Sequence, residues 1–308
     1  MSSNVPLIVK ILASSVSVAS RAGKIVRDVM SKGELGIVEK AKDDYQTEAD
    51  RSAQKCIIAS LSAQFPTIKI IGEEDNPENE DIPSDWLVVD GDSEILKLVC
   101  PPSLEGVREE DVVVWVDPLD GTAEYTQGFL EHVTVLIGIS VNEKPVAGVI
   151  HQPYYKNLGG GATGRTIWGL SGAGVGGFSL VPPPETLIIT TTRSHSNPLV
   201  ESALQVMNAS QIMRVGGAGY KVLQLLEGKV SVYLFASSGC KKWDTCAPEA
   251  VLSAAGGHLT DILGNSYKYG PNESHPNKTG VLAAVNKELH SYALNKLPQE
   301  LKDQLVNK

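Results

Sequence analysis

The chain has 308 residues, of which 42% are hydrophobic, so it can bury a sizeable core in one large domain or in two closely packed ones. Its 36 acidic residues outnumber 27 lysines and arginines, which gives a net charge of −9 and a pI near 5.2. Because no block of basic residues occurs, this balance argues against nucleic acid and against an anionic membrane surface as partners.

The N-terminal segment has the pattern of an amphipathic helix. Apolar residues recur at helical spacing through 7–30, while Lys10 interrupts the first apolar run and basic residues follow at similar spacing. We therefore expect a helix there and not a signal peptide. The four cysteines form neither a CxxC pair nor a dense framework, and no apolar run reaches about 18 residues. These features predict a reduced, soluble, intracellular protein, which we place in the cytoplasm.

The sequence pattern up to about residue 170 predicts one more helix and then a run of strands. A second apolar stripe over 49–65 predicts a helix, and 69–75 a short buried strand that runs into acids. We expect residues 75–110 to form a solvated excursion with one weak helix around 92–99. Runs of β-branched residues then predict further strands, at 111–116, 133–141, 144–153 and 164–170. The glycine-rich stretches 159–164 and 172–177 lack the spacing of a phosphate loop, so hairpin loops are favoured.

The stretch VPPPE at 181–185 marks a boundary between two halves, 1–184 and 185–308. After this boundary, expected strands alternate with expected helices at 197–207, 219–227 and 246–255 and at the C-terminus. The alternation predicts an α/β half with helices packed on a sheet, whereas the first half is typical of an α+β arrangement.

Residues 112–128, VVVWVDPLDGTAEYTQG, bring two carboxylates to the end of a buried run. Asp117 and Asp120 lie in an expected turn after this run. Pro118 fixes φ in the turn, and Gly121 lets the backbone approach a neighbour closely. Taken alone, this motif could equally well cap a helix and close a turn.

Further acids lie at the end of another predicted strand and at a predicted helix start. GEED at 72–75 follows another apolar strand, and KKWDTCAPE at 241–249 places Asp244 at an expected helix start. Two like charges about 4 Å apart repel by about 4 kcal/mol at an effective dielectric near 20, so acids that share a cleft need cations or protons. No histidine or cysteine cluster accompanies these acids, which favours Mg²⁺ over Zn²⁺. Backbone N–H groups of Gly121 and Thr122 could then meet a phosphate oxygen.

Together, GEED, WVDPLDGTAEYTQG and KKWDTCAPEAVLSAAGG resemble the lithium-sensitive, magnesium-dependent phosphatases related to inositol monophosphatase. Within that family, the ordered motifs GIVEK, HQPYY, GRTIWG, TTTRSHSN and RVGGAG are similar to those of the bisphosphate nucleotidase branch, and the resemblance covers nearly the whole chain. It implies a mixed α+β and α/β fold, the layered α-β-α-β-α sandwich of the inositol monophosphatase and fructose-1,6-bisphosphatase type. We expect a monomer, although the sequence itself carries no signal for the oligomeric state.

The resemblance also implies an activity. The chain would remove the 3′-phosphate of adenosine 3′,5′-bisphosphate, giving AMP and phosphate, and would act on related nucleotides such as 3′-phosphoadenylyl sulfate through a metal-activated water. Two or three Mg²⁺ ions and inhibition by Li⁺ are expected with it. An inositol monophosphatase or inositol polyphosphate 1-phosphatase activity is the alternative. A catalytically silent phosphate- or metal-binding protein is a third, which the intact ligand positions argue against.

Roles follow from the resemblance where residues match its motifs. The implied metal ligands are Glu73, Asp117, the carbonyl of Leu119, Asp120 and Asp244, the last of which also faces the substrate. Thr122 and Asp50 would form the water-activating pair, and the alternative for Asp50 is an ordinary acid at a helix N-terminus.

The implied nucleotide-binding residues are Thr192, His195, Gly217 and Lys221. On sequence alone, His195 could instead be a surface or cap residue, and Lys221 a solvated helix lysine. Lys241 and Lys242 could face an anionic ligand or lie in a solvated turn. Ala123 stands where we expect a lysine in close relatives, which puts one peripheral electrostatic contact in question.

Overall fold

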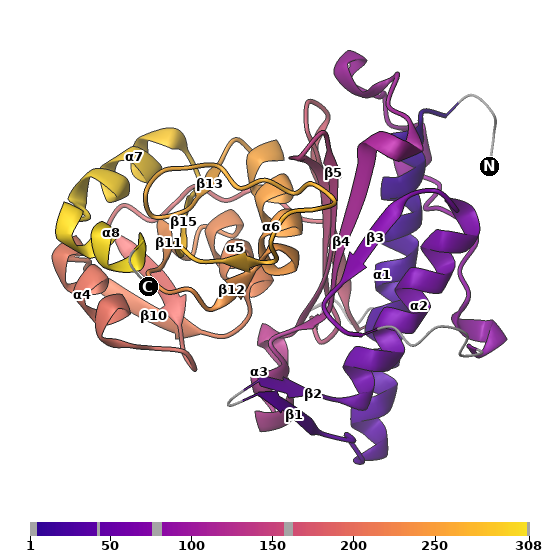
Figure 1. The fold of residues 1–308 in the computed structure, drawn as a ribbon, viewed down its shortest axis with the longest axis horizontal. Helices are drawn as coiled ribbons and strands as arrows, with labels where there is room; N and C mark the ends of the chain where they lie inside the picture. Colours follow the sequence, from indigo (N-terminus) through magenta and orange to yellow (C-terminus); the bar gives the residue numbers. More distant parts are fainter. Residues whose placement is uncertain (1–4, 42–43, 76–81, 157–162, 307–308) are drawn as a thin grey trace.

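Two long helices cover one face of a six-stranded sheet (Figure 1). The computed structural model describes residues 5–41, 44–75, 82–156 and 163–306. Helices α1 (Leu7–Lys32) and α2 (Glu48–Gln64) confirm the two helices expected from the apolar stripes. Thr47 caps α2, and Asp50 completes the capping box by accepting the Thr47 N–H. This cap fixes Asp50 at the start of its helix.

The first sheet is mixed. Its order is β3-β4-β5-β6-β7-β8, where β3 is parallel to β4 and all other neighbours are antiparallel. The strands are β3 (Lys69–Gly72), β4 (Val112–Asp120), β5 (Thr134–Val141), β6 (Lys144–Gln152), β7 (Arg165–Leu170) and β8 (Gly174–Gly176). The sequence did not predict β8, which forms inside the glycine-rich stretch 172–177. Most of the other glycine-rich stretch, 159–164, lies outside the described residues.

The segment before β4 is more buried than expected. Its described residues form four short 3₁₀ helices, η1 (Ser84–Trp86), η2 (Ile95–Lys97), η3 (Pro102–Leu104) and η4 (Glu109–Asp111). Ile95, Cys100 and Leu104 are buried in the same core cluster as α1. The prediction of a solvated excursion is therefore wrong for these residues, because isolated apolar side chains can join a core without any periodic pattern.

The second sheet has five strands in the order β10-β9-β11-β15-β13. The first three are parallel, and β15 is antiparallel to both of its neighbours. They are β9 (Ile188–Thr192), β10 (Gln211–Val215), β11 (Val232–Phe235), β13 (His258–Thr260) and β15 (Val281–Ala284). Two very short pairs complete the strands: β1 (Val38–Ala41) with β2 (Asp44–Gln46), and β12 (Cys240–Lys241) with β14 (Pro276–Asn277).

The layers follow the order helix, sheet, helix, sheet, helix. Helices α5 (Ala218–Leu226) and α6 (Lys242–Ala254) lie between the two sheets, and α4 (Pro198–Met207), α7 (Lys287–Lys296) and α8 (Gln299–Val306) cover the far side of the second sheet (Figure 1). This confirms the expected α-β-α-β-α sandwich. The expected helix at 246–255 begins four residues earlier, at Lys242.

Helix α6 lies directly on the first sheet because three glycines form a row across β5, β6 and β7. Gly138 pairs with Gly148, which pairs with Gly169. A Cβ on Gly138 would lie 2.6 Å from the Cys246 sulfur, and one on Gly148 would lie 2.5 Å from the Ala247 oxygen. The absence of side chains lets the helix backbone touch the sheet.

The two sheets lie on either side of residues 181–185 in the sequence, yet the halves share a core. Leu136, Ile150 and Ile167 of the first sheet belong to the same buried cluster as the second sheet. The division between residues 184 and 185 stays a prediction. None of the described helices combines the length and apolarity that a membrane crossing requires. All four cysteines are buried and unpaired.

Candidate active site

A cavity of about 580 Å³ lies where the end of β4 meets the starts of α5 and α6. Its wall comes from both halves of the chain. Ten of the residues predicted from the sequence line it: Glu73, Asp117, Leu119, Asp120, Thr122, Thr192, His195, Gly217, Lys221 and Asp244. Asp50 lies behind Thr122, to which it is hydrogen-bonded. The structure thus brings the whole predicted set to one place.

Strand β4 carries Asp117 and Asp120 into the cavity. The sequence predicted a turn after residue 116, but the strand continues to Asp120 with a register shift against β5 between the two acids. Pro118, which cannot donate to a strand ladder, falls within this bulge. The Leu119 N–H donates to Asp117 Oδ1 at 3.0 Å, which fixes the first carboxylate.

Asp120 joins the first sheet to the start of α5. Its carboxylate accepts the Ala218 and Gly219 N–H groups, both at 2.8 Å, and the Thr134 hydroxyl at 2.6 Å. These donors and Lys221 favour its ionised form, although burial raises its pKa on balance. Asp120 is therefore held rigidly, with a helix N-terminus facing its charge.

The other acids repel one another across the cavity. Burial, followed by repulsion from Glu73, Asp120 and Asp244, raises the pKa of Asp117 well above its usual value. Burial and then repulsion from Asp244 raise the pKa of Glu73 to about 8. Burial and repulsion from Asp120 raise the pKa of Asp244 to about 6. Such a set would ionise fully only beside added positive charge.

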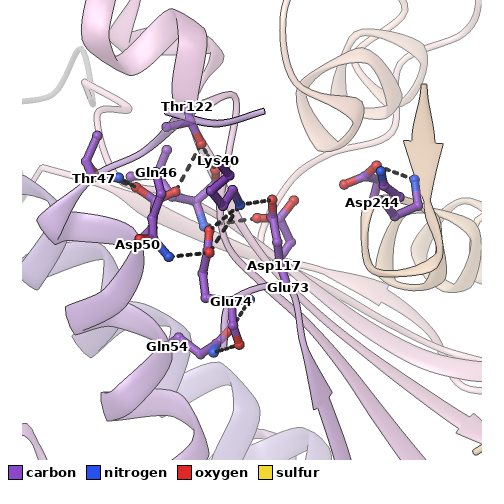
Figure 2. Close-up of polar contacts among 12 residues, drawn as sticks. Lys40, Gln46, Thr47, Asp50, Gln54, Glu73, Glu74, Asp117, Thr122 and Asp244 are labelled. Atoms are coloured by element: carbon purple, nitrogen blue, oxygen red, sulfur yellow. Dashed lines mark hydrogen bonds and ion pairs between the residues drawn. The ribbon is translucent and has the colours of Figure 1, made fainter. Parts of the chain in front are cut away.

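The acids approach the cavity from two sides. Figure 2 shows Glu73 and Asp117 near each other and Asp244 across from them at the start of α6, where it accepts the Lys241 N–H at 2.6 Å. Within the described ranges, no three acidic, histidine or cysteine side chains converge closely enough to enclose a metal ion as they stand. The oxygen-only donor set and the mutual repulsion nevertheless fit a hard divalent cation.

Lys40 is a cavity residue that sequence reasoning missed. Its Nζ lies 3.2 Å from Glu73 Oε1 and 2.9 Å from Glu74 Oε1 (Figure 2), and it lowers the pKa of Glu73. Lys40 comes from β1, within the GIVEK motif. That motif was the available signal, although nothing in its composition indicates a partner 33 residues away.

Thr122 and Asp50 form a hydrogen-bonded pair at the edge of the cavity. The Thr122 hydroxyl lies 3.0 Å from Asp50 Oδ1 (Figure 2). It also lies 3.1 Å from the Leu119 carbonyl. The other Asp50 oxygen accepts the N–H and hydroxyl of Thr47. Burial raises the pKa of Asp50 to about 6, against these hydrogen bonds. Asp50 is therefore both a helix-capping acid and the partner of Thr122.

The opposite wall holds the residues predicted to bind nucleotide. Thr192 is buried at the end of β9 and accepts the His195 N–H at 2.9 Å, while the His195 side chain is exposed at the rim. Gly217 precedes α5 with φ +69°, and a Cβ there would lie 2.7 Å from the His132 carbonyl. Only glycine fits this turn without displacement.

Lys221 is buried and faces the cavity, so it is not a solvated helix lysine. Its Nζ donates to the Gly217 carbonyl at 3.0 Å and lies 5.5 Å from the centre of the Tyr233 ring. Burial lowers its pKa, while the Asp120 carboxylate acts in the opposite direction.

Lys241 and Lys242 point to different surroundings. Lys241 lines the cavity, whereas Lys242 is buried and its Nζ lies 5.7 Å from the ring centres of both Tyr267 and Tyr269. Lys242 is not among the residues of the cavity wall, and the prediction of a solvated turn is wrong for it.

Glu124 and Arg193 connect the two walls. Glu124 is buried, lines the cavity and pairs with Arg193 Nη1 at 3.3 Å. The Arg193 guanidinium lies 3.9 Å from the centre of the Phe129 ring. No sequence pattern indicated this pair. Glu124 directly follows Ala123 in WVDPLDGTAEYTQG, and Ala123 also lines the cavity.

A family model described as "Inositol monophosphatase family" matches residues 8–302. The chain belongs to the inositol monophosphatase family. This family comprises metal-dependent phosphatases, so the sequence-based recognition and the enzyme class are confirmed.

Individual relatives agree with this membership. The mouse protein "3'(2'),5'-bisphosphate nucleotidase 1" is 51% identical over 99% of this chain and 100% of its own. A cattle relative, "Golgi-resident adenosine 3',5'-bisphosphate 3'-phosphatase", is 34% identical over 94% of this chain and 79% of its own. The solved structure of the suhB protein from Bartonella henselae shares the fold, with a TM-score of 0.67 at 22% identity over 93% of this chain and 97% of that one.

Proposed function

We propose that this phosphatase is a Mg²⁺-dependent 3′(2′),5′-bisphosphate nucleotidase. Its reaction would remove the 3′-phosphate of adenosine 3′,5′-bisphosphate, and of related nucleotides such as 3′-phosphoadenylyl sulfate. One observation carries the proposal: a single cavity has acids and the Thr122–Asp50 pair on one side and Thr192, His195 and Lys221 on the other. The identity to the mouse relative over the full length supports the same substrate class.

The acidic wall would hold the cofactor. Glu73, Asp117, Asp120, Asp244 and the Leu119 carbonyl supply only oxygen donors, which fits Mg²⁺, and we propose two or three ions. Bound there, Mg²⁺ supplies positive charge that neutralises the ester phosphate and lowers the pKa of a water. Its charge also offsets the repulsion that raises the pKa values of these acids.

Thr122 and Asp50 would handle the proton of the attacking water. With its hydrogen directed to Asp50, the Thr122 hydroxyl would keep an oxygen lone pair to accept a hydrogen bond from water. A carboxylate with a pKa of about 6 can take up a proton near neutral pH, so Thr122 can pass one to Asp50. Thr47 holds Asp50 in place from the other side.

The opposite wall would select the substrate. Lys221 and the Gly217 backbone would bind the second phosphate, because a buried ammonium group needs an anion more than a solvated one does. Thr192 and His195 would contact the nucleoside part. We also propose a cytoplasmic monomer, which light scattering after size-exclusion chromatography and cell fractionation would test.

A phosphate-release assay tests the proposal. Adenosine 3′,5′-bisphosphate, 3′-phosphoadenylyl sulfate, inositol 1-phosphate and inositol 1,4-bisphosphate would be compared with Mg²⁺, with EDTA, and with Mg²⁺ plus millimolar Li⁺. We expect the nucleotides to give the larger kcat/KM, with activity lost in EDTA and reduced by Li⁺. A larger kcat/KM for an inositol phosphate would support the alternative, and full activity in EDTA would refute the metal assignment.

A further inference from the structure

His132 lies behind the substrate wall of the cavity, at the contact between the two halves. It ends the short helix η5 (Leu130–His132) and is buried, but it is not among the cavity-lining residues. Its Nδ1 lies 3.2 Å from the Gly216 N–H, which donates to it. An imidazole that accepts a hydrogen bond through Nδ1 is neutral and carries its hydrogen on Nε2.

Two aromatic rings fix the orientation of this imidazole. The Tyr220 ring of α5 is stacked on it with centroids 4.7 Å apart and planes at 28°. On the Phe129 side the centroids are 6.0 Å apart and the planes at 17°. The rings hold the imidazole plane, and therefore its Nδ1 lone pair, toward Gly216.

The charged groups around the ring act in both directions. Burial lowers the pKa of His132, as do Lys221 and Arg193, while Glu131 and Glu124 raise it. The net direction is downward, which matches the neutral ring that the hydrogen bond requires.

The Gly216–Gly217 turn packs closely against the Glu124 side chain and the His132 backbone. A Cβ on Gly216 would lie 1.9 Å from Glu124 Cδ, and one on Gly217 would lie 2.7 Å from the His132 carbonyl. The Gly217 carbonyl in turn accepts from Lys221. The position of the turn therefore sets the position of the Lys221 ammonium group.

We propose that His132 is a positioning residue for substrate binding: its imidazole holds the Gly216–Gly217 turn so that the Gly217 backbone and Lys221 face the second phosphate. The inference rests on the proposed function for its substrate. His132 contributes no contact to the substrate itself and no proton to the reaction.

Three variants separate the hydrogen bond from the ring packing. His132→Phe keeps a flat ring for Phe129 and Tyr220 but removes the acceptor. His132→Asn removes the ring but keeps an oxygen acceptor near the place of Nδ1. Tyr220→Leu removes the stack and leaves the acceptor, so it serves as the packing control.

The readouts are kcat and KM for adenosine 3′,5′-bisphosphate and the hydrogen-exchange rate of the Gly216 amide in the substrate-free enzyme. For His132→Phe we expect KM to rise about tenfold with kcat within about twofold, since a buried donor is left without an acceptor, and Gly216 exchange to accelerate. His132→Asn should return KM to within about threefold of wild type. Tyr220→Leu loosens the ring but keeps the acceptor, so it should raise KM less than His132→Phe does.

Equal KM values for His132→Phe and His132→Asn would overturn the proposal, because packing alone would then explain the loss. Unchanged KM in His132→Phe despite faster Gly216 exchange would also overturn it. Since exchange is measured without substrate, a wild-type enzyme inactive on the nucleotide would refute the proposed function, and the exchange rates would still decide whether His132 holds the turn.

Discussion

Thr122 and Asp50 lie 72 positions apart in the sequence, and the hydroxyl of the first lies 3.0 Å from a carboxylate oxygen of the second. The contact joins the start of α3 (Thr122–Gln127) to the first turn of α2. Because Thr47 occupies the other Asp50 oxygen, the carboxylate is aligned for Thr122 before any substrate binds.

We expect Thr122→Ala to lower kcat by about 10²- to 10³-fold, because it removes the proton relay and leaves every acidic residue of the cavity in place. Thr122→Ser keeps the hydroxyl and should stay within about tenfold of wild type. Steady-state kinetics together with a Mg²⁺ titration would show this. Unchanged kcat with weakened Mg²⁺ binding would mean that Thr122 serves the metal and not the water.

Asp117→Asn should lower activity by about 10³-fold or more, equivalent to roughly 4 kcal/mol of transition-state stabilisation. The change keeps the shape of the side chain but removes one charge from the acidic wall. It should also reduce the rise in Tm that Mg²⁺ produces in the wild type. The exposed Asp28 gives the matched control as Asp28→Asn. Near wild-type turnover of Asp117→Asn at saturating Mg²⁺ would refute the ligand role.

Lys221→Ala should raise KM for adenosine 3′,5′-bisphosphate by an amount worth about 1.5–3 kcal/mol, the value of a charge-assisted hydrogen bond. Adenosine 3′-monophosphate lacks the 5′-phosphate, so its kcat/KM should barely change, and the enzyme–substrate double cycle isolates the contact. Equal losses for both substrates would show that Lys221 acts by holding the Gly217 carbonyl. Lys241→Ala, at another lysine of the cavity wall, would then be measured for the same selectivity.

We expect the stability of the protein to depend on pH through Glu249, a buried acid that is not among the residues lining the cavity. Burial raises its pKa from 4.5 to about 8, although Tyr269 donates a hydrogen bond to it. Between these pH values the native protein holds a proton that the unfolded chain has released, so the free energy of unfolding falls as pH rises through this window. Glu249→Gln stays neutral and should remove this slope.

Chemical denaturation at pH 5 and pH 8 would measure the effect. Relative to wild type, we expect Glu249→Gln to gain on the order of 2 kcal/mol between the two pH values. The exposed Glu288→Gln is the control and should show no such gain. Parallel pH profiles for Glu249→Gln and wild type would contradict the prediction.

The sequence predicted the elements whose burial leaves an apolar pattern, either a helical stripe or a continuous β-branched run. The stripes of α1 and α2 and the β-branched runs of β4 to β7 each face a core, so their patterns carry the signal. The paired strands β1 and β2 carried no such signal, since Val38 is 50% exposed, as is the preceding Ile37 at 53%, and no alternation marks a buried face. For this reason the position of Lys40 could not be predicted.

Within the candidate site, ordered motifs predicted which residues share the cavity but not how they are held. Asp120 looked like a turn residue, yet the Ala218 and Gly219 amides that bind it come from about a hundred positions later. The contacts of His132 with Gly216 and of Arg193 with Glu124 likewise depend on how the halves pack. Local composition carries no information about such pairings.

Substitutions in the glycine row beneath α6 would change the distance between acids of the cavity without replacing any of those acids. Each Cβ added at Gly138, Gly148 or Gly169 would meet the helix, so an alanine there must push α6 away from the sheet. Asp244 belongs to α6 and would be displaced with it, whereas Asp117 belongs to β4 and would keep its position in the sheet. Distant substitutions in this row would therefore change the separation of two acids, and with it the size of cation that suits them, while the acids themselves remain identical.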